Sequence, residues 1–111
     1  MNADQIIYEK WKGQVRKGLL EYFVFCVIKE NESYGYEILQ SLKRYTSMHV
    51  TESAVYPILA RSAKEGLMTC EKMKSPNGPA RQYYKLTPAG RIWLARMNVF
   101  VQEMSADFGV N

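Results

Sequence analysis

The apolar residues of this chain change their spacing at residue 67, and that change limits the fold more than any other feature. Before it they recur every three or four residues, which is the spacing of helices. Over residues 67–74 they alternate with polar residues, as in a strand. Residues 75–79 contain two prolines and an Asn-Gly pair, which predict a turn, and the aromatic-rich residues 81–86 predict a second strand. We therefore expect several helices first and a two-stranded hairpin after them.

Three helical segments are predicted before residue 46. Residues 2–11 form the first, with Asp4 near its positive end, and Gly13 is expected to loosen the chain after it. Residues 16–29 form the strongest core helix, because their apolar residues follow the i, i+3, i+4 pattern. Ser33 is expected to cap a helix over residues 34–45, with Glu37 in its first turn, and residues 46–50 connect it to the next segment.

Residues 51–67 predict a helix with one apolar face and one polar, aromatic and basic face. Val55, Ile58 and Leu59 form the apolar stripe, and Gly66 stands where a helix ends in a left-handed residue. Thr51 begins the segment with a side chain that can accept from free amides of the first turn. Such a helix can lie in a DNA major groove. An ordinary amphipathic surface helix is the alternative. With the helices before it and the basic hairpin after it, the segment predicts a winged helix-turn-helix unit.

The last helix predicts a contact with a second copy of the chain. Thr87 is its expected cap and Pro88 its first residue. Its apolar residues recur at steps of four, three, four and four, and the stripe outlasts the core that the other helices supply. We expect dimerisation through this stripe and through an apolar flank of the N-terminal helix, an interface formed by Ile6, Ile7, Trp11, Trp93, Met97, Phe100, Met104 and Phe108.

The size and the pattern together predict one mainly helical α+β domain. The chain has 111 residues, which is the size of one domain. Residues 1–12 are assigned to the N-terminal dimer helix, residues 14–87 to the winged-helix core and residues 88–108 to the C-terminal dimerisation helix. The formal net charge is +4, and residues 67–90 contribute a net +3. A basic hairpin favours a polyanionic partner, although lysines that prevent edge-to-edge pairing of strands are an alternative explanation.

Several classes of protein are disfavoured by the composition. Cys26 and Cys70 are far apart in the sequence, which argues against a disulfide and for a reducing compartment. No signal peptide is visible and the longest apolar run is too short to span a membrane, so a cytoplasmic location is expected. The single histidine, His49, has no cluster of metal ligands or nucleophiles around it in the sequence. We therefore predict no enzyme activity, no metal and no cofactor.

Four motifs in this order resemble the PadR-type transcriptional regulators over residues 18–90. The motifs are Tyr34-Gly35-Tyr36-Glu37-Ile38, Val55-Tyr56-Pro57-Ile58-Leu59, Glu65-Gly66-Leu67 and Tyr83-Tyr84-Lys85-Leu86-Thr87-Pro88-Ala89-Gly90. The resemblance, to the short subfamily, implies a winged-helix homodimer that represses transcription, often autoregulated or released by a small aromatic ligand. The chain departs from the family at Ser62, where a leucine is common, and at Val101, where short members commonly have a tryptophan.

The residues predicted to contact DNA are Tyr36, Thr51, Glu52, Ser53, Tyr56, Arg61, Lys64, Lys72, Lys74, Arg81 and Gln82. Some have an alternative role. Glu52 can accept from a cytosine amine or cap its helix, and Tyr56 can reach a phosphate or pack on the preceding helix. Arg61 and Lys64 point either to phosphates or to solvent.

A second predicted site is a cavity for an aromatic effector at the dimer centre. Trp11, Trp93, Met97 and Phe100 are its candidate lining, because surfaces rich in methionine and aromatic residues adapt to varied ligands. A plain hydrophobic dimer seam is the alternative. A rival to the whole reading is a winged-helix module that binds another protein and not DNA.

Overall fold

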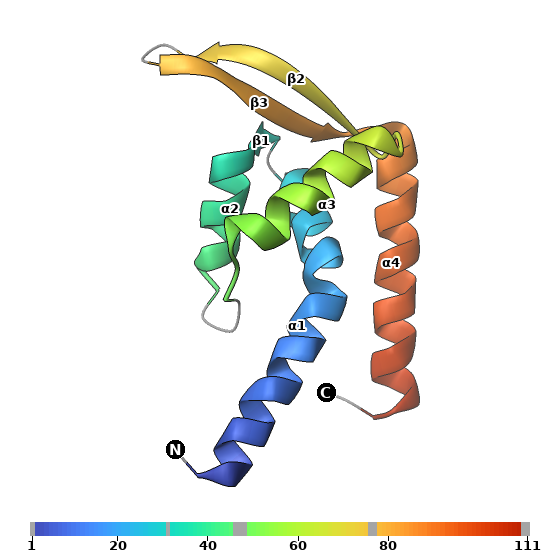
Figure 1. The fold of residues 1–111 in the computed structure, drawn as a ribbon. Helices are drawn as coiled ribbons and strands as arrows, with labels where there is room; N and C mark the ends of the chain where they lie inside the picture. The colour runs from blue at the N-terminus through green and yellow to red at the C-terminus, as the bar shows by residue number, and fades with distance from the viewer. Residues whose placement is uncertain (1, 31, 46–48, 76–77, 110–111) are drawn as a thin grey trace.

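The computed structural model describes residues 2–30, 32–45, 49–75 and 78–109. The parts of the predicted connector and turn that fall on residues 46–48 and 76–77 lie outside this description. The elements are α1 (Ala3–Glu30), β1 (Ser33–Tyr34), α2 (Gly35–Lys43), α3 (Glu52–Lys64), β2 (Met68–Ser75), β3 (Gly78–Leu86) and α4 (Pro88–Asp107) (Figure 1). This arrangement confirms the predicted class, a mainly helical α+β fold, in which the hairpin follows α3.

Helix α1 is one continuous helix of 28 residues, so the prediction of a break at Gly13 was wrong. A glycine inside a helix costs about 1 kcal/mol relative to alanine, which the good helix formers around it offset. Twenty-eight residues extend for about 42 Å, and the two halves differ. The C-terminal half is buried through Leu20, Val24, Phe25 and Ile28, whereas the N-terminal half extends away from α2, α3 and the sheet (Figure 1).

The hairpin belongs to a three-stranded antiparallel sheet in the order β1-β3-β2. The third strand was not predicted, because β1 is only two residues long. Ser33 pairs with Tyr84 and Tyr34 with Tyr83, which draws Ser33 into the sheet instead of leaving it to cap α2. Tyr34 is the N-cap, and the Glu37 carboxylate accepts from its backbone N–H at 3.0 Å. The cap prediction was therefore wrong for Ser33, and Glu37 does lie in the first turn.

Helix α3 ends as predicted, at a left-handed glycine. Gly66 has a φ of +79°. Its N–H donates to the Ala63 carbonyl at 3.2 Å, and the Leu67 N–H donates to the Ser62 carbonyl at 2.9 Å. These two bonds form a Schellman motif, which reverses the chain toward β2. The Ser62 side chain, at the position of the missing leucine, is 1 % exposed, and its hydroxyl has no hydrogen-bond partner among the described residues.

The end of α3 is tied to the start of α4 at one junction. The Thr87 N–H donates to the Leu67 carbonyl at 3.1 Å, and the Thr87 hydroxyl donates to the Gly66 carbonyl at 2.7 Å. The same hydroxyl accepts from the Gly90 N–H at 3.0 Å, which confirms Thr87 as the cap of α4, with Pro88 as its first residue. A Cβ atom on Gly90 would lie only 1.9 Å from the Leu67 carbonyl oxygen. Only glycine permits this approach.

The core lies where the C-terminal half of α1 meets α2, α3, the base of the sheet and the first turns of α4. Its most buried side chains are Val24, Phe25, Ile28, Ile38, Leu39, Leu42, Val55, Leu59, Met68 and Leu94. The predicted inward positions of α2 and α3 are among them except Ile58, which is only partly buried and packs against this core. In the part of the chain that the structure describes, we find no helix with the length and apolarity needed to cross a membrane.

We predict that Gly90→Ala lowers the free energy of unfolding by about 3 kcal/mol, because the added methyl group would overlap the Leu67 carbonyl. Urea denaturation followed by circular dichroism measures this change. Gly13→Ala is the matched control. It adds the same methyl group within a helix, meets nothing within 4 Å, and should raise stability by about 0.5–1 kcal/mol. Equal stability of the two variants would contradict the close contact at Gly90.

Candidate nucleic-acid interface

The first turn of α3 presents its polar side chains to solvent. Thr51, Glu52 and Ser53 are all exposed. Thr51 is the N-cap through its backbone, since its carbonyl accepts from the Ala54 and Val55 N–H groups at 3.1 Å. Its side chain makes no capping bond within the described residues. Its hydroxyl instead lies 3.0 Å from that of Ser53. Two hydroxyls and a carboxylate therefore lie together at the start of the helix, where they can meet base edges or phosphates.

A surface hollow of about 470 Å³ joins the beginning of α2, the middle of α3 and the strand β3. We call it the tyrosine hollow. Its lining brings together four of the residues that were predicted to contact DNA, although they come from three elements. The lining residues are Tyr34, Gly35, Tyr36, Tyr56, Ala60, Arg81, Gln82 and Tyr84.

Gly35 shapes the tyrosine hollow, and the sequence reasoning missed this role. A Cβ atom at residue 35 would lie 2.9 Å from Cε1 of Tyr56 and 3.6 Å from Cε2 of Tyr84. The absence of a side chain lets the Tyr56 ring pack on the first turn of α2. Tyr56 is half-buried, so it packs on the preceding helix and also lines the surface hollow. The signal in the sequence was a glycine between two tyrosines at the start of a helix.

Two phenols of the hollow, those of Tyr56 and Tyr84, have raised pKa values. Burial raises the pKa of Tyr84 to about 12, and its hydroxyl donates to Oε1 of Gln82 at 2.9 Å. Burial also raises the pKa of Tyr56, with a further contribution from the Glu52 carboxylate. Cys70, opposite Tyr84 in the hairpin, donates to the same Gln82 oxygen at 3.1 Å. A neutral phenol keeps its O–H, and an O–H can donate to a phosphate oxygen.

The basic side chains of the hairpin and of the end of α3 are exposed. In the register of the hairpin, Lys72 lies opposite Gln82, whereas Arg81 lies opposite Met73 on the other face. Arg81 still lines the tyrosine hollow. Lys64, in the last turn of α3, is exposed as well. Lys74 lies next to the irregular pairing between Met73 and Ser75. These four exposed cations come from the hairpin and from the last turn of α3.

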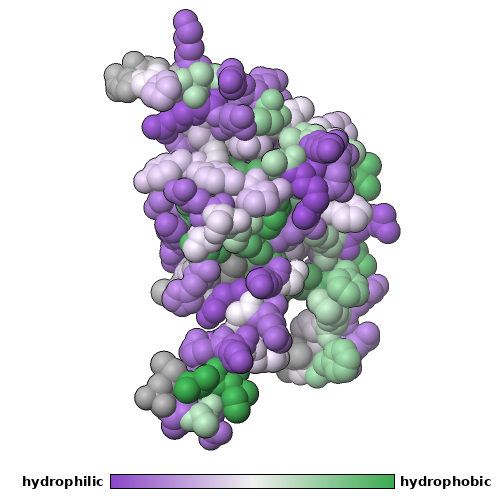
Figure 2. All heavy atoms as spheres, in the orientation of Figure 1, coloured by the Kyte–Doolittle hydropathy of each residue, from purple (hydrophilic) through white to green (hydrophobic). Residues whose placement is uncertain are grey.

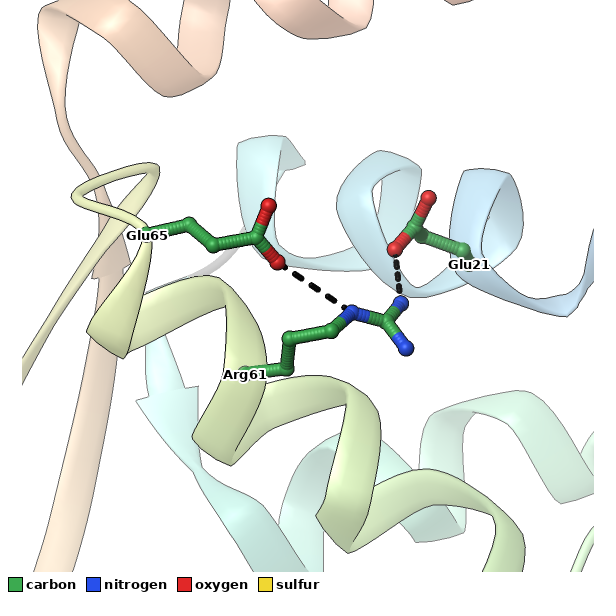
Figure 3. A network of polar contacts seen from close by, with 3 residues as sticks. All are labelled: Glu21, Arg61 and Glu65. Atoms are coloured by element: carbon green, nitrogen blue, oxygen red, sulfur yellow. Dashed lines mark hydrogen bonds and ion pairs between the residues drawn. The ribbon is translucent and has the colours of Figure 1, made fainter.

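Arg61 differs from the other predicted cations because two carboxylates hold it. One guanidinium nitrogen donates to Glu21 on α1, and Nε lies 3.2 Å from Oε1 of Glu65 one turn further along α3 (Figure 3). The hydrogen bond to Glu21 raises the pKa of the guanidinium above its ordinary value. The side chain is 55 % exposed, as the solvent alternative expected, although two carboxylates engage its guanidinium. A phosphate contact stays a prediction. The side chain points across to α1.

A second surface feature is an apolar groove between α1 and α4, with a volume of about 680 Å³, which we call the α1–α4 groove. Trp93, Met97 and Phe100, three of the four residues predicted to line an effector cavity, are in its lining. Trp11 is not, and stacks on Tyr8 with ring centroids 6.1 Å apart. The lining residues are Gln14, Val15, Gly18, Leu19, Glu21, Tyr22, Trp93, Arg96, Met97, Phe100, Val101 and Met104.

The projecting half of α1 and the length of α4 leave large apolar side chains uncovered. Figure 2 shows hydrophobic residues gathered at the free end of α1 and along α4. Ile6, Ile7 and Trp11 are 49 %, 65 % and 56 % exposed, and Phe108 is 82 % exposed. The Tyr22 hydroxyl bonds to Asn98 and so connects the two helices at the level of the groove.

The described residues contain no group of three or more His, Cys, Asp or Glu side chains that could hold a metal ion. Cys26 and Cys70 are both free thiols. Burial raises the pKa of the Cys26 thiol, which makes it a weak nucleophile at neutral pH.

Known proteins resemble this chain in both sequence and fold. A family model described as the transcriptional regulator PadR-like family matches residues 24–96. Transcriptional regulator Rv3488 of Mycobacterium tuberculosis is 32 % identical over 78 residues, which cover 70 % of this chain and 71 % of that protein. A PadR-like transcriptional regulator from Bacillus cereus has a crystal structure that is 32 % identical, with a TM-score of 0.76 over 86 % of this chain and 93 % of that one.

The fold extends to a more distant relative. The crystal structure of a PadR family transcriptional regulator from Eggerthella lenta is 24 % identical and covers 98 % of this chain and 91 % of its own, with a TM-score of 0.84. At that identity the likeness shows the fold alone. Together with the family model, which spans more than half of the chain, these relatives establish the class. The chain belongs to the PadR-like family of transcriptional regulators and is not an enzyme.

Proposed function

We propose that this regulator represses transcription by binding a palindromic DNA site as a homodimer. The observation that carries the proposal is the tyrosine hollow, which gathers Tyr36, Tyr56, Arg81 and Gln82 beside the exposed start of α3. Three elements thereby offer hydrogen-bond donors and a positive charge to one ligand. DNA backbone has the matching acceptors, and a helix flanked by such a surface can enter the major groove.

The residues divide into two roles in this proposal. Thr51, Glu52 and Ser53 at the start of α3 meet base edges, because this turn carries exposed hydroxyls and a carboxylate. Tyr36, Tyr56 and Arg81 of the hollow, with Lys64, Lys72 and Lys74, meet phosphates. Phosphate contacts hold the protein in register, and only the base contacts select a sequence.

The homodimer is proposed from the uncovered apolar surface. The free end of α1 exposes Ile6, Ile7 and Trp11, while the α1–α4 groove offers Trp93, Met97 and Phe100. The first set is convex and the second lines a hollow, so that each set can cover the other between two copies. A two-fold arrangement would bury both sets twice, which suits an isologous interface.

An aromatic effector is the second part of the proposal. The α1–α4 groove has the size of a small-molecule site. Two of its lining residues already stack, because the Arg96 guanidinium lies over the Trp93 ring, 5.7 Å from the ring centre. A planar compound can stack on the same ring. In this proposal Trp11 reaches the effector only through the partner copy, since it does not line the groove of its own chain.

We predict that the protein protects a symmetric region in the DNA upstream of its own gene, with half-sites one helical turn apart, about 34 Å. Changing Lys72, Lys74 and Arg81 together to Ala should abolish this footprint at physiological salt. Six cations are lost per dimer, so the slope of log K against log salt should fall by about 5. Footprinting and fluorescence anisotropy at several salt concentrations measure both effects.

The matched control changes Lys10, Lys17 and Lys29 to Ala. These lysines on α1 are exposed, carry the same total charge and line neither hollow. The control should keep the footprint. If the unmodified protein binds its upstream DNA no better than random DNA of equal length, the protein-binding module becomes the better reading.

We predict that Ile7→Glu weakens dimerisation roughly 30-fold or more, since it places a carboxylate in the proposed apolar seam. Ile7 is 65 % exposed in the single chain, so its own fold should be little affected. Sedimentation velocity over a range of concentrations measures the monomer–dimer equilibrium. Lys10→Glu, a charge change on an exposed neighbour along the same helix, is the control. A wild-type protein that remains monomeric at high micromolar concentration would refute the dimer.

We predict that acridine, a planar hydrophobic compound, quenches the tryptophan fluorescence of the wild-type protein through Trp93. Trp93→Ala should lose most of the quenching, and Trp11→Ala should keep more of it, because only Trp93 lines the groove of its own chain. Fluorescence titration of the three proteins gives the comparison. Equal quenching in all of them would remove the effector site from the proposal.

A further inference from the structure

Glu21 and Arg61 connect the helix proposed for dimerisation to the helix proposed for reading DNA. Glu21 lies on α1, lines the α1–α4 groove, and accepts a hydrogen bond from Arg61 on α3. The two residues are 40 positions apart in the sequence. Figure 3 shows the Arg61 side chain reaching toward Glu21 on α1, while Glu65, the C-cap residue of α3, contacts the same guanidinium.

The apolar contacts that hold α3 to the core are less directional than this ion pair. Helix α3 buries Val55, Leu59 and Ser62. The first two contribute apolar contact, which stabilises the packing but constrains the angle between helices weakly. Ser62 is next to Arg61 and is buried, yet it lacks both the bulk of leucine and a hydrogen-bond partner among the described residues. The charge-assisted bond to Glu21 is a directional contact that joins α3 directly to α1.

The charges around Arg61 also argue against a phosphate contact. Two carboxylates face one guanidinium, so the group as a whole has a net charge of −1. A phosphate that approached the guanidinium would be repelled by the two carboxylates that already bind it. Arg61 is exposed like Lys64, but two carboxylates engage its guanidinium.

We propose that the Glu21–Arg61 pair fixes the orientation of α3 on α1, and thereby the spacing of the two α3 helices when a dimer binds DNA. This inference rests on the proposed function. Arg61 is then a positioning residue and not a DNA contact. Because Glu21 also lines the α1–α4 groove, whatever fills the groove touches the residue that holds α3.

The test uses Glu21→Gln, Arg61→Gln and the double variant, with binding measured on the fragment upstream of the protein's own gene. The pair is partly exposed, so each single change should weaken binding roughly two- to five-fold per subunit, or about 4- to 25-fold for a dimer. The double variant should be no weaker than either single variant, because both remove the same bond. The salt slope should not change.

The sign of the Glu21→Gln effect separates the two roles of Arg61. If Arg61 contacts phosphate, removing the competing carboxylate strengthens DNA binding, and Arg61→Gln lowers the salt slope by about 2 for a dimer. Either result overturns the proposal. Glu65→Gln is the matched control. It removes the same charge next to the same arginine but leaves the connection to α1, so it should not weaken binding.

A second variant and a second measurement keep the test decisive. Arg61→Lys keeps the charge but lacks the guanidinium fork that reaches both carboxylates, so it should bind DNA as weakly as Arg61→Gln. If the wild-type protein shows no preference for the upstream fragment, the proposed function fails. In that case, hydrogen exchange of the α3 backbone amides tests the Glu21–Arg61 pair without DNA. The pair predicts equally faster exchange in Glu21→Gln, Arg61→Gln and the double variant, and unchanged exchange in all three overturns it.

Discussion

The junction at Leu67 is the contact on which the rest of the structure depends. The Leu67 carbonyl accepts from the Thr87 N–H and lies against Gly90, so the end of α3 and the beginning of α4 are in direct contact. The chain enters β2 from this junction and comes back to it at the end of β3. The direction of the hairpin relative to α3, and of α4 relative to both, is therefore set by a few backbone groups. A winged helix places its wing beside its reading helix, and here these bonds determine that placement.

The local signals in the sequence were sufficient for much of this fold. Gly66 ends α3 in the left-handed conformation, and Thr87 caps α4 with Pro88 behind it, as their residue types predict. The strand period after residue 67 likewise marks β2. These features depend on neighbours within four residues, which a reader of the sequence can see. Where the outcome depended on distant partners, the predictions failed. Ser33 is a good cap by its type, but pairing with Tyr84 draws it into the sheet. Glycine commonly weakens a helix, but α1 continues through Gly13.

The candidate site shows the same division. The exposed positions along α3 follow from helical periodicity, and so do the apolar residues that hold the helix to the core. The contact between Gly35 and Tyr56, and the ion pair between Glu21 and Arg61, join different helices. Periodicity within one element cannot predict which charges meet across two elements. The expectation that Arg61 faces phosphate or solvent rested on its own helix alone, whereas the carboxylate that binds it comes from α1.

The continuity of α1 has a consequence for how two copies would meet. Starting a helix is the costly step, and extending one is cheap. The buried half of α1 is held by the core of each chain, so the exposed half can grow from it as a helix without a new nucleus. The apolar residues at its free end are then ordered before any encounter. Association in this form is a docking of two preformed surfaces and not a folding reaction, and it loses little conformational entropy to the ordering of a disordered arm.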